Sequence, residues 1–99
     1  MTEAQYKELQ AWCSSNLNKK IYPELYKKKI ALRNKATQIR RNIILCRGYI
    51  KDSTFILGNC KTQEAIAKWK GIVLTHQASK KVWQDEFNNL QDETNESKD

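Results

Sequence analysis

The sequence predicts an all-α protein, a three-helix bundle in which two long helices form an antiparallel hairpin and a shorter N-terminal helix packs on it. The long helices are expected at about residues 23–47 and 63–90. Apolar residues recur along both segments in alternating steps of three and four, the period of helices that pack lengthwise. Proline and glycine mark helix boundaries, and Pro23 and Gly48 flank the first segment. A connection of about ten residues favours an antiparallel return.

The N-terminal helix is expected at about residues 3–15. Thr2 can cap it, because Gln5 follows three residues later and completes a capping box. The polar stretch Ser14-Ser15-Asn16 should end it. One face carries the apolar side chains Tyr6, Leu9 and Cys13, with Trp12 beside them. This face would cover part of the groove of the hairpin.

The first long helix should begin at Pro23, whose ring presets the first helical position, and end before Gly48. Its seam positions alternate in steps of three and four: Tyr22, Leu25, Lys29, Leu32, Ala36, Ile39, Ile43, Cys46 and Ile50. Lys29 alone breaks the apolar pattern. The connection at 51–61 contains Phe55-Ile56-Leu57, which we expect to tuck against the helix ends.

The second long helix should begin after Thr62, a good N-cap residue. Its seam shows the same alternation: Ile66, Trp69, Val73, His76, Lys80, Trp83, Phe87 and Leu90. His76 and Lys80 are the polar members. Together with Lys29 of the other helix they form a candidate polar site within the seam.

Two lysines in a seam require an explanation, because a buried ammonium group without a counter-charge costs several kcal/mol. If Ile43 approached Ile66 or Trp69, both Lys29 and Lys80 would come near Trp83. Three outcomes remain open. In the first, the lysine side chains extend to water, with Lys29 stacked on Trp83. In the second, they pair with Glu3 or Glu8 of the N-terminal helix. In the third, they pair with an acidic group of a partner.

At 43–45 and 72–74, three consecutive apolar residues cover more of the helix circumference than a contact between two helices can bury. The N-terminal helix, the Phe55 segment or a second chain would have to cover them, so a homodimer is one alternative.

Charge is divided unevenly along the 99 residues, whose net charge is +7. Residues 19–51 hold eleven Lys or Arg and one acid, Glu24, which gives +10. Residues 85–99 hold six acids and Lys98, which gives −5. We therefore expect one helical domain at 1–90 and an acidic disordered tail at 91–99.

Enzymes and metalloproteins fit this sequence poorly. His76 is the only histidine, and the spacing of Cys13, Cys46 and Cys60 fits neither a disulfide framework nor a zinc site. Phosphate-binding glycine loops are also missing, as are paired carboxylates on one helical face away from the acidic end. We expect no catalytic residues, no metal and no cofactor. No apolar run reaches the roughly 18 to 20 residues that cross a bilayer, so we expect a cytoplasmic protein without a membrane partner.

Arg33, Arg40 and Arg47 occupy the same position in three successive heptads of the first long helix. They are spaced by about 10 Å in a row beside the seam. The neighbouring basic residues are Lys27, Lys28, Lys35 and Arg41. Such a row fits an acidic protein surface or a phosphate backbone. A solvated helix face remains an alternative, although solvated faces usually mix charges of both signs.

We therefore predict a non-enzymatic helical protein-binding module, an adaptor, inhibitor or assembly factor that docks its basic helix face on an acidic surface of a larger protein. The alternative is a protein that binds DNA or RNA through the phosphate backbone, using the same arginines and lysines.

Overall fold

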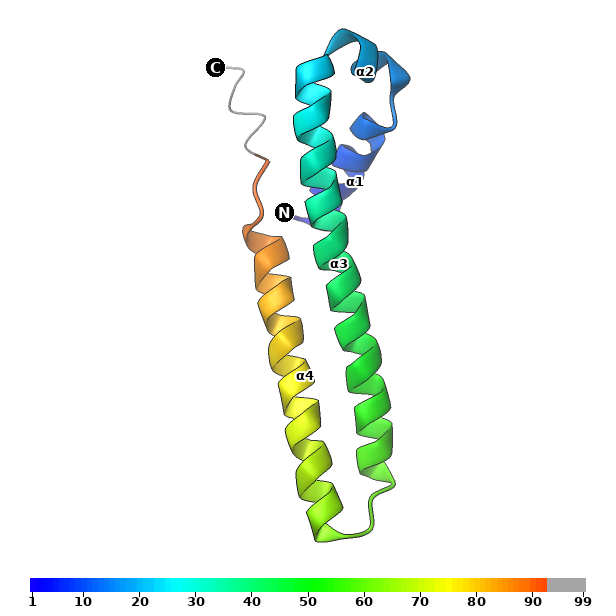
Figure 1. The fold of residues 1–99 in the computed structure, drawn as a ribbon, viewed down its shortest axis with the longest axis vertical. Coiled ribbons are helices and arrows are strands. Elements are labelled where there is room, and N and C mark those ends of the chain that lie inside the picture. The colour runs from blue at the N-terminus through cyan, green and yellow to red at the C-terminus, as the bar shows by residue number, and fades with distance from the viewer. Residues whose placement is uncertain (93–99) are drawn as a thin grey trace. The chain divides into compact units, whose positions relative to one another are not determined.

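The computed structural model describes residues 1–92, and every regular element in that part of the chain is a helix. The four helices are α1 (Glu3–Cys13), α2 (Asn16–Ile21), α3 (Pro23–Gly58) and α4 (Gln63–Asn89) (Figure 1). The predicted all-α class is confirmed. Of the acidic tail expected at 91–99, the residues from 93 onward lie outside the described part.

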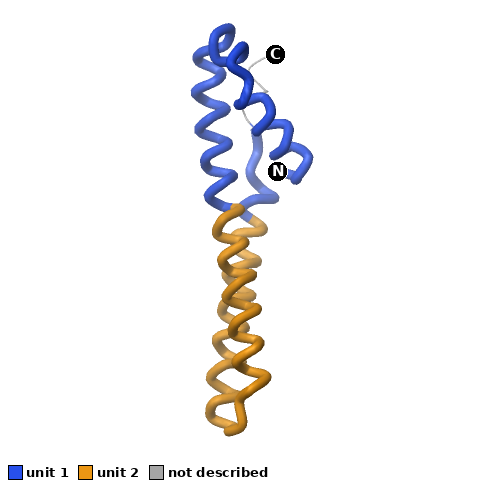
Figure 2. Tube along the Cα trace, turned by 90° about the vertical axis from the view of Figure 1, so that its right-hand side faces the viewer, with its two compact units in different colours: residues 1–39, 86–99 blue, residues 40–85 orange. Residues whose placement is uncertain are grey.

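The chain divides into two compact units, which are coloured separately in Figure 2. Unit 1 consists of Met1–Ile39 and the chain from Glu86 onward. Unit 2 is the continuous segment Arg40–Asp85.

In unit 1, α1 begins as predicted. The Thr2 Oγ1 atom accepts a hydrogen bond from the Gln5 backbone N–H at 3.1 Å, and the Gln5 Oε1 atom accepts one from the Thr2 N–H at 2.8 Å. This capping box satisfies two of the four N–H groups that a helix start leaves open. The helix ends at Cys13, two residues earlier than the expected boundary at 15.

The sequence did not predict α2. Ser15, which we expected to lie at the end of a helix, instead begins the next one, since its hydroxyl accepts from the Asn18 N–H at 3.3 Å. Serine favours both kinds of position. The six residues of α2 are too few to show a helical period, and the apolar Leu17 and Ile21 are both exposed.

The core of unit 1 lies where α1 meets α3 and the end of α4. Tyr6 packs edge-on against Phe87 with ring centroids 6.2 Å apart, and its hydroxyl lies 2.7 Å from that of Thr37. The Met1 ammonium group donates hydrogen bonds of 2.8 Å to three backbone carbonyls at the end of α4. These carbonyls belong to Phe87, Asn88 and Leu90. The other buried apolar residues are Leu9, Cys13, Ala36 and Ile39.

The predicted end of the first long helix is wrong, because α3 runs through Gly48 to Gly58 instead of ending at 47. No glycine among residues 1–92 has a positive φ, so Gly48 is an ordinary helical residue. A glycine inside a helix costs about 1 kcal/mol relative to alanine, which packing of the seam can offset. The seam continues through Ser53, whose buried hydroxyl donates to the Tyr49 carbonyl at 2.6 Å.

The segment 51–61 is therefore not a ten-residue connection. Asn59–Thr62 alone joins the two long helices, and Phe55 lies on α3 with its side chain in water. The predicted second long helix is confirmed, since α4 spans Gln63–Asn89 and the Thr62 hydroxyl accepts from the Ala65 N–H at 3.2 Å.

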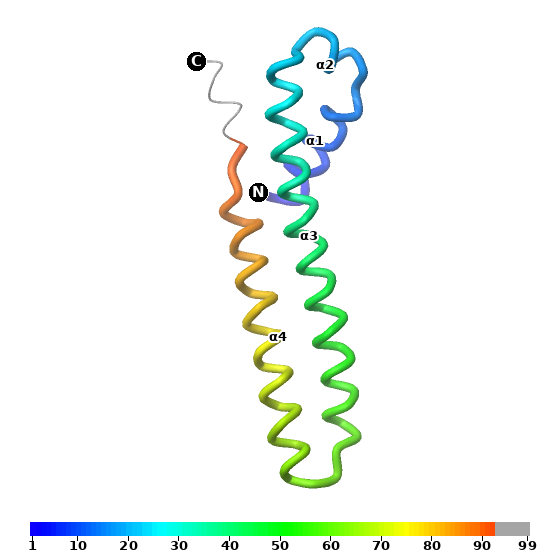
Figure 3. Tube along the Cα trace, viewed as in Figure 1, coloured from blue at the N-terminus to red at the C-terminus, as the bar shows by residue number. Residues whose placement is uncertain are grey.

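Within unit 2, the parts of α3 and α4 lie side by side and antiparallel (Figure 3). The rings of Tyr49 and His76 meet across them at 5.2 Å. Ile43 precedes Tyr49 by six residues, so its antiparallel counterpart lies about six residues after His76, near Trp83. The register that would bring Ile43 to Ile66 or Trp69 is therefore wrong. That register followed from the prediction that the first long helix ends before Gly48, whereas α3 ends at Gly58.

The three cysteines are unpaired thiols. Cys13 is buried in unit 1 and Cys46 is buried in unit 2. Cys60 lies in the turn before α4, is half-buried, and donates its thiol hydrogen to the Ile56 carbonyl at 3.2 Å.

Candidate functional site

All seven basic residues predicted to bind a partner lie on α3. Four belong to unit 1: Lys27, Lys28, Arg33 and Lys35. Three belong to unit 2: Arg40, Arg41 and Arg47.

Of the four in unit 1, Lys27 and Arg33 have weak partners at the surface. Lys27 lies 3.8 Å from Glu24, but both side chains are largely exposed, and pairs of this kind contribute little to stability. Arg33 is half-buried and donates to the Asn34 side-chain oxygen at 3.2 Å. Lys28 and Lys35 are exposed.

In unit 2, Arg41 and Arg47 extend into water while Arg40 is half-buried. Within residues 1–92, no carboxylate lies at ion-pair distance from Arg41 or Arg47. Their guanidinium groups are thus available to a carboxylate or a phosphate from outside this part of the chain.

Large apolar side chains lie beside these arginines. Ile44 is 59% exposed and Phe55 is 73% exposed, although Phe55 was expected to tuck against the helix ends. Leu45, Tyr49 and Ile56 of the same helix are also exposed. At 3.6 residues per turn, Ile44 and Phe55 share one side of α3, whereas Leu45, Tyr49 and Ile56 share another. Exposed apolar side chains that share one side of a helix are typical of a protein-binding site.

The exposed residues of α3 follow a second heptad pattern. We use the name α3 outer face for five exposed residues separated by steps of three and four: Arg41, Ile44, Gly48, Lys51 and Phe55. At 3.6 residues per turn they lie on the side of the helix away from the buried Ile43 and Cys46. This spacing is present in the sequence, but the prediction that the helix ends before Gly48 separated Arg41 and Ile44 from Lys51 and Phe55.

A shallow cleft of about 400 Å³ lies between the two helices of unit 2, lined by residues other than those of the α3 outer face. Three cations line it, namely Arg47 of α3 with Lys80 and Lys81 of α4. The other lining residues are Ile50, Gln77, Gln84 and Asp85. The half-buried seam residue Lys80 thus reaches the same groove as Arg47.

The polar seam residues are distributed over both units. His76 and Lys80 lie in unit 2, where His76 is half-buried against Tyr49. Lys29 lies in unit 1 and is only 7% exposed, so the expected extension to water is wrong.

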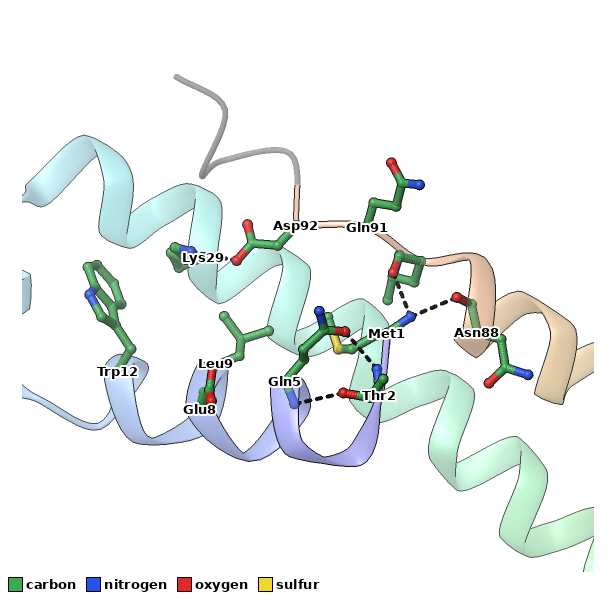
Figure 4. Close-up of a pocket in the computed structure, with 11 residues that line it drawn as sticks. Met1, Thr2, Gln5, Glu8, Leu9, Trp12, Lys29, Asn88, Gln91 and Asp92 are labelled. Carbon is green, nitrogen blue, oxygen red and sulfur yellow. Dashed lines mark hydrogen bonds and ion pairs between the residues drawn. The ribbon is translucent and has the colours of Figure 1, made fainter. Parts of the chain in front are cut away.

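Lys29 is held by a carboxylate from the C-terminal segment. Its Nζ atom lies 2.5 Å from the Asp92 Oδ2 atom and 5.9 Å from the centroid of the Trp12 ring (Figure 4). Pairing with an acid of this chain was one of the alternatives left open by the sequence, but the acids considered there were Glu3 and Glu8. Asp92 follows the end of α4, where no periodic pattern indicates which way the chain runs.

Lys29 and Asp92 also line a cleft of about 660 Å³ in unit 1. The remaining lining residues are Met1, Thr2, Gln5, Glu8, Leu9, Trp12, Asn88, Leu90 and Gln91 (Figure 4). Within residues 1–92, no buried side-chain nitrogen or oxygen lacks a hydrogen-bond partner. The buried polar side-chain atoms around this cleft therefore all have partners within the described residues.

Cys13 lies close to the same charges. Burial raises the pKa of its thiol above the ordinary value of 9.0, and the positive charges of Arg33 and Lys29 offset that increase only in part. The thiol is therefore protonated at neutral pH, which is the less reactive form.

Between residues 1 and 92, no group of three His, Cys, Asp or Glu side chains is placed to hold a metal ion. In the same stretch, none of the helices has the length and apolar character needed to cross a membrane. Comparison with protein-family models, with curated proteins and with solved structures finds no match to this chain.

Proposed function

We propose that this protein is a non-enzymatic helical module, an adaptor, inhibitor or assembly factor, that binds an acidic surface of a larger protein in the cytoplasm. The observation that carries the proposal is the α3 outer face, where exposed apolar side chains alternate with cations. A partner that offers apolar groups edged by carboxylates would satisfy both parts of this face.

Both parts contribute to binding, but in different ways. Covering a side chain such as Ile44 or Phe55 completely is favourable by about 1.5–3 kcal/mol. Unit 2 carries nine Lys or Arg and three Asp or Glu, which gives +6. This charge would speed the encounter with an acidic partner and disfavour basic ones.

Nucleic acid is the less favoured ligand. A phosphate backbone would pair with Arg41 and Arg47 but would leave Ile44 and Phe55 in water. Binding driven by phosphates alone gains nothing from those apolar side chains.

The test combines capture with reconstitution. Immobilised protein is incubated with nuclease-treated extract of its native host, and the captured protein is identified, purified and titrated by calorimetry. We expect a stoichiometric complex that Arg41→Glu/Arg47→Glu abolishes. The matched control is Lys7→Glu/Lys20→Glu, which changes the charge equally on exposed lysines of unit 1 outside the seven predicted binding residues and should keep the complex.

Nucleic acid provides the opposing outcome. Fluorescent duplex and single-strand probes are titrated at about 50 and 200 mM salt, since phosphate-driven binding weakens steeply over this range. Micromolar binding with that salt dependence, together with an empty capture after nuclease treatment, would contradict a protein partner and support the alternative.

A further inference from the structure

We infer that the occupant of the α3 outer face is an acidic amphipathic helix of the partner, which crosses α3 at Gly48. This inference rests on the proposed function and adds the shape and the chemistry of the bound segment.

Gly48 is the starting point, because nothing inside the fold requires a glycine there. It lies within the 36-residue helix α3, where glycine is less favourable than alanine. Its φ is not positive, and a Cβ atom built on it would meet no atom within 4 Å. The missing side chain therefore serves neither a turn nor internal packing.

On the outside, the glycine leaves the helix backbone bare between two exposed apolar residues, Ile44 and Phe55. Small residues at a crossing point let two helices approach closely, and flanking apolar side chains can then pack on either side of the contact. Gly48 thus lies where a crossing helix would have its closest approach.

The size of the face fits a helix. From Arg41 to Phe55 the residues of the α3 outer face recur at heptad spacing over about 21 Å, or four turns. Heptad spacing is the pattern that pairs with the apolar stripe of a second helix.

The charges identify the occupant as acidic. Arg41 and Lys51 lie on the face itself, with the exposed Asp52 next to Lys51, and Arg47 flanks the face. Arg47 also lines the cleft of unit 2, which adds the cations Lys80 and Lys81 and one acid, Asp85. A second copy of unit 2 would bring a further +6 against these cations. Glutamate or aspartate residues flanking an apolar stripe would instead be attracted to them.

The other helix of unit 2 supplies a matched control. Gly71 of α4 is also exposed, and a Cβ atom there would likewise meet nothing within 4 Å. Within seven residues on either side, its exposed apolar neighbours at helical spacing are the small Ala67 and Ala78 and the large Leu74, and Val82 follows four residues after Ala78. A crossing helix would therefore gain less contact on α4.

The experiment compares stability with binding. The probe is a labelled synthetic helix of about 18 residues with leucines at heptad spacing and glutamates on both flanks. Gly48→Ala should raise Tm by about 4–8 °C, yet weaken probe binding at least about tenfold, because the added methyl group separates the helices. Gly71→Ala should raise Tm equally and leave binding unchanged.

Two further probes test the chemistry. A probe with lysines in place of the glutamates, and a scrambled probe of the same acidic composition, should both bind at least about tenfold more weakly. Equal binding of either one would overturn the inference, as would no binding of the acidic probe at about 1 mM.

The variants separate the inference from the proposed function. If Gly48→Ala binds the acidic probe as tightly as the unaltered protein, while Arg41→Glu/Arg47→Glu loses it, the crossing at Gly48 is wrong and an acidic partner still stands. If the arginine variant also binds the acidic probe unchanged, the crossing at Gly48 and the acidic partner are both wrong.

Discussion

At the residue scale, the pairing of Lys29 with Asp92 explains how a lysine can occupy a seam position. An ammonium group that is 7% exposed requires a counter-charge, and the Asp92 carboxylate supplies it directly. The ring of Trp12 adds a weaker attraction to the same cation.

The two halves of this ion pair should respond differently to substitution. Asp92→Asn removes the negative charge next to the buried ammonium group and should lower the free energy of unfolding by about 1–3 kcal/mol. Lys29→Met should cost less, because methionine fills a similar volume and the Asp92 side chain is 22% exposed to water.

Urea unfolding measures both changes. Lys27→Met is the control, since the exposed pair of Lys27 with Glu24 should be worth less than about 1 kcal/mol. A larger loss in Lys29→Met than in Asp92→Asn would refute this account of the pair.

The buried thiol of Cys13 predicts a loss of stability at alkaline pH. In the unfolded chain this thiol ionises near 9.0, whereas burial raises its pKa in the folded protein. Between these two values the folded state holds more protons, so the free energy of unfolding falls as the pH rises. Below the unfolded value the contribution of Cys13 does not change with pH.

Stability curves at about pH 8 and pH 10 measure this effect, because the two values lie on either side of the unfolded thiol pKa. Cys13→Ala should lose less stability over this interval than the unaltered protein. Cys60→Ala serves as the control and should show the full loss. Identical slopes for all three proteins would exclude Cys13 as the source.

At the scale of elements, the sequence correctly predicted those helix starts and spans that depend on heptad periodicity and capping residues. The capping box at Thr2, the cap at Thr62 and the span of α4 are all confirmed. The end of α3 was not predictable from glycine alone. A single glycine is a weak stop signal when the seam continues beyond it, as it does here through Ser53.

The candidate site was predictable in part. Charge counting identified Arg41 and Arg47, because basic residues without interspersed acids can be read directly from the sequence. It could not show that Phe55 points into water, because that depends on where α3 ends. Asp92 was missed for a different reason, since an ion pair between residues 63 positions apart leaves no local pattern.

The two phenylalanines provide a test of how the elements pack. Phe87 is 3% exposed and lies against Tyr6, so Phe87→Ala should cost about 3–5 kcal/mol and loosen α1. Phe55→Ala removes the same ring from an exposed position and should change stability by less than about 1 kcal/mol. Thermal unfolding compares the two, and a comparable loss in both would mean that Phe55 is covered in solution.

At the scale of the whole molecule, the net charge of +7 opposes self-association through the exposed apolar residues. The charges repel across a screening length of about 10 Å at 0.1 M salt, which shrinks to about 3 Å at 1 M. The balance between repulsion and apolar contact therefore depends on salt.

Light scattering should find a monomer at about 0.1 M salt and a growing dimer fraction at about 1 M. Phe55→Gln should suppress the dimer at high salt, because it removes an exposed ring from the contact. A stable dimer already present at low salt would contradict the assignment of the α3 outer face to an acidic partner.

The three thiols differ in burial, so one of them can be labelled selectively with a dye. Cys60 sits at the hairpin turn and is the least buried of them, while Cys13 and Cys46 are enclosed in the folded chain. A maleimide dye under native conditions should therefore attach first to Cys60, one helical turn or more beyond Phe55. The natural chain can thus be tagged for distance measurements by energy transfer without introducing a single new residue.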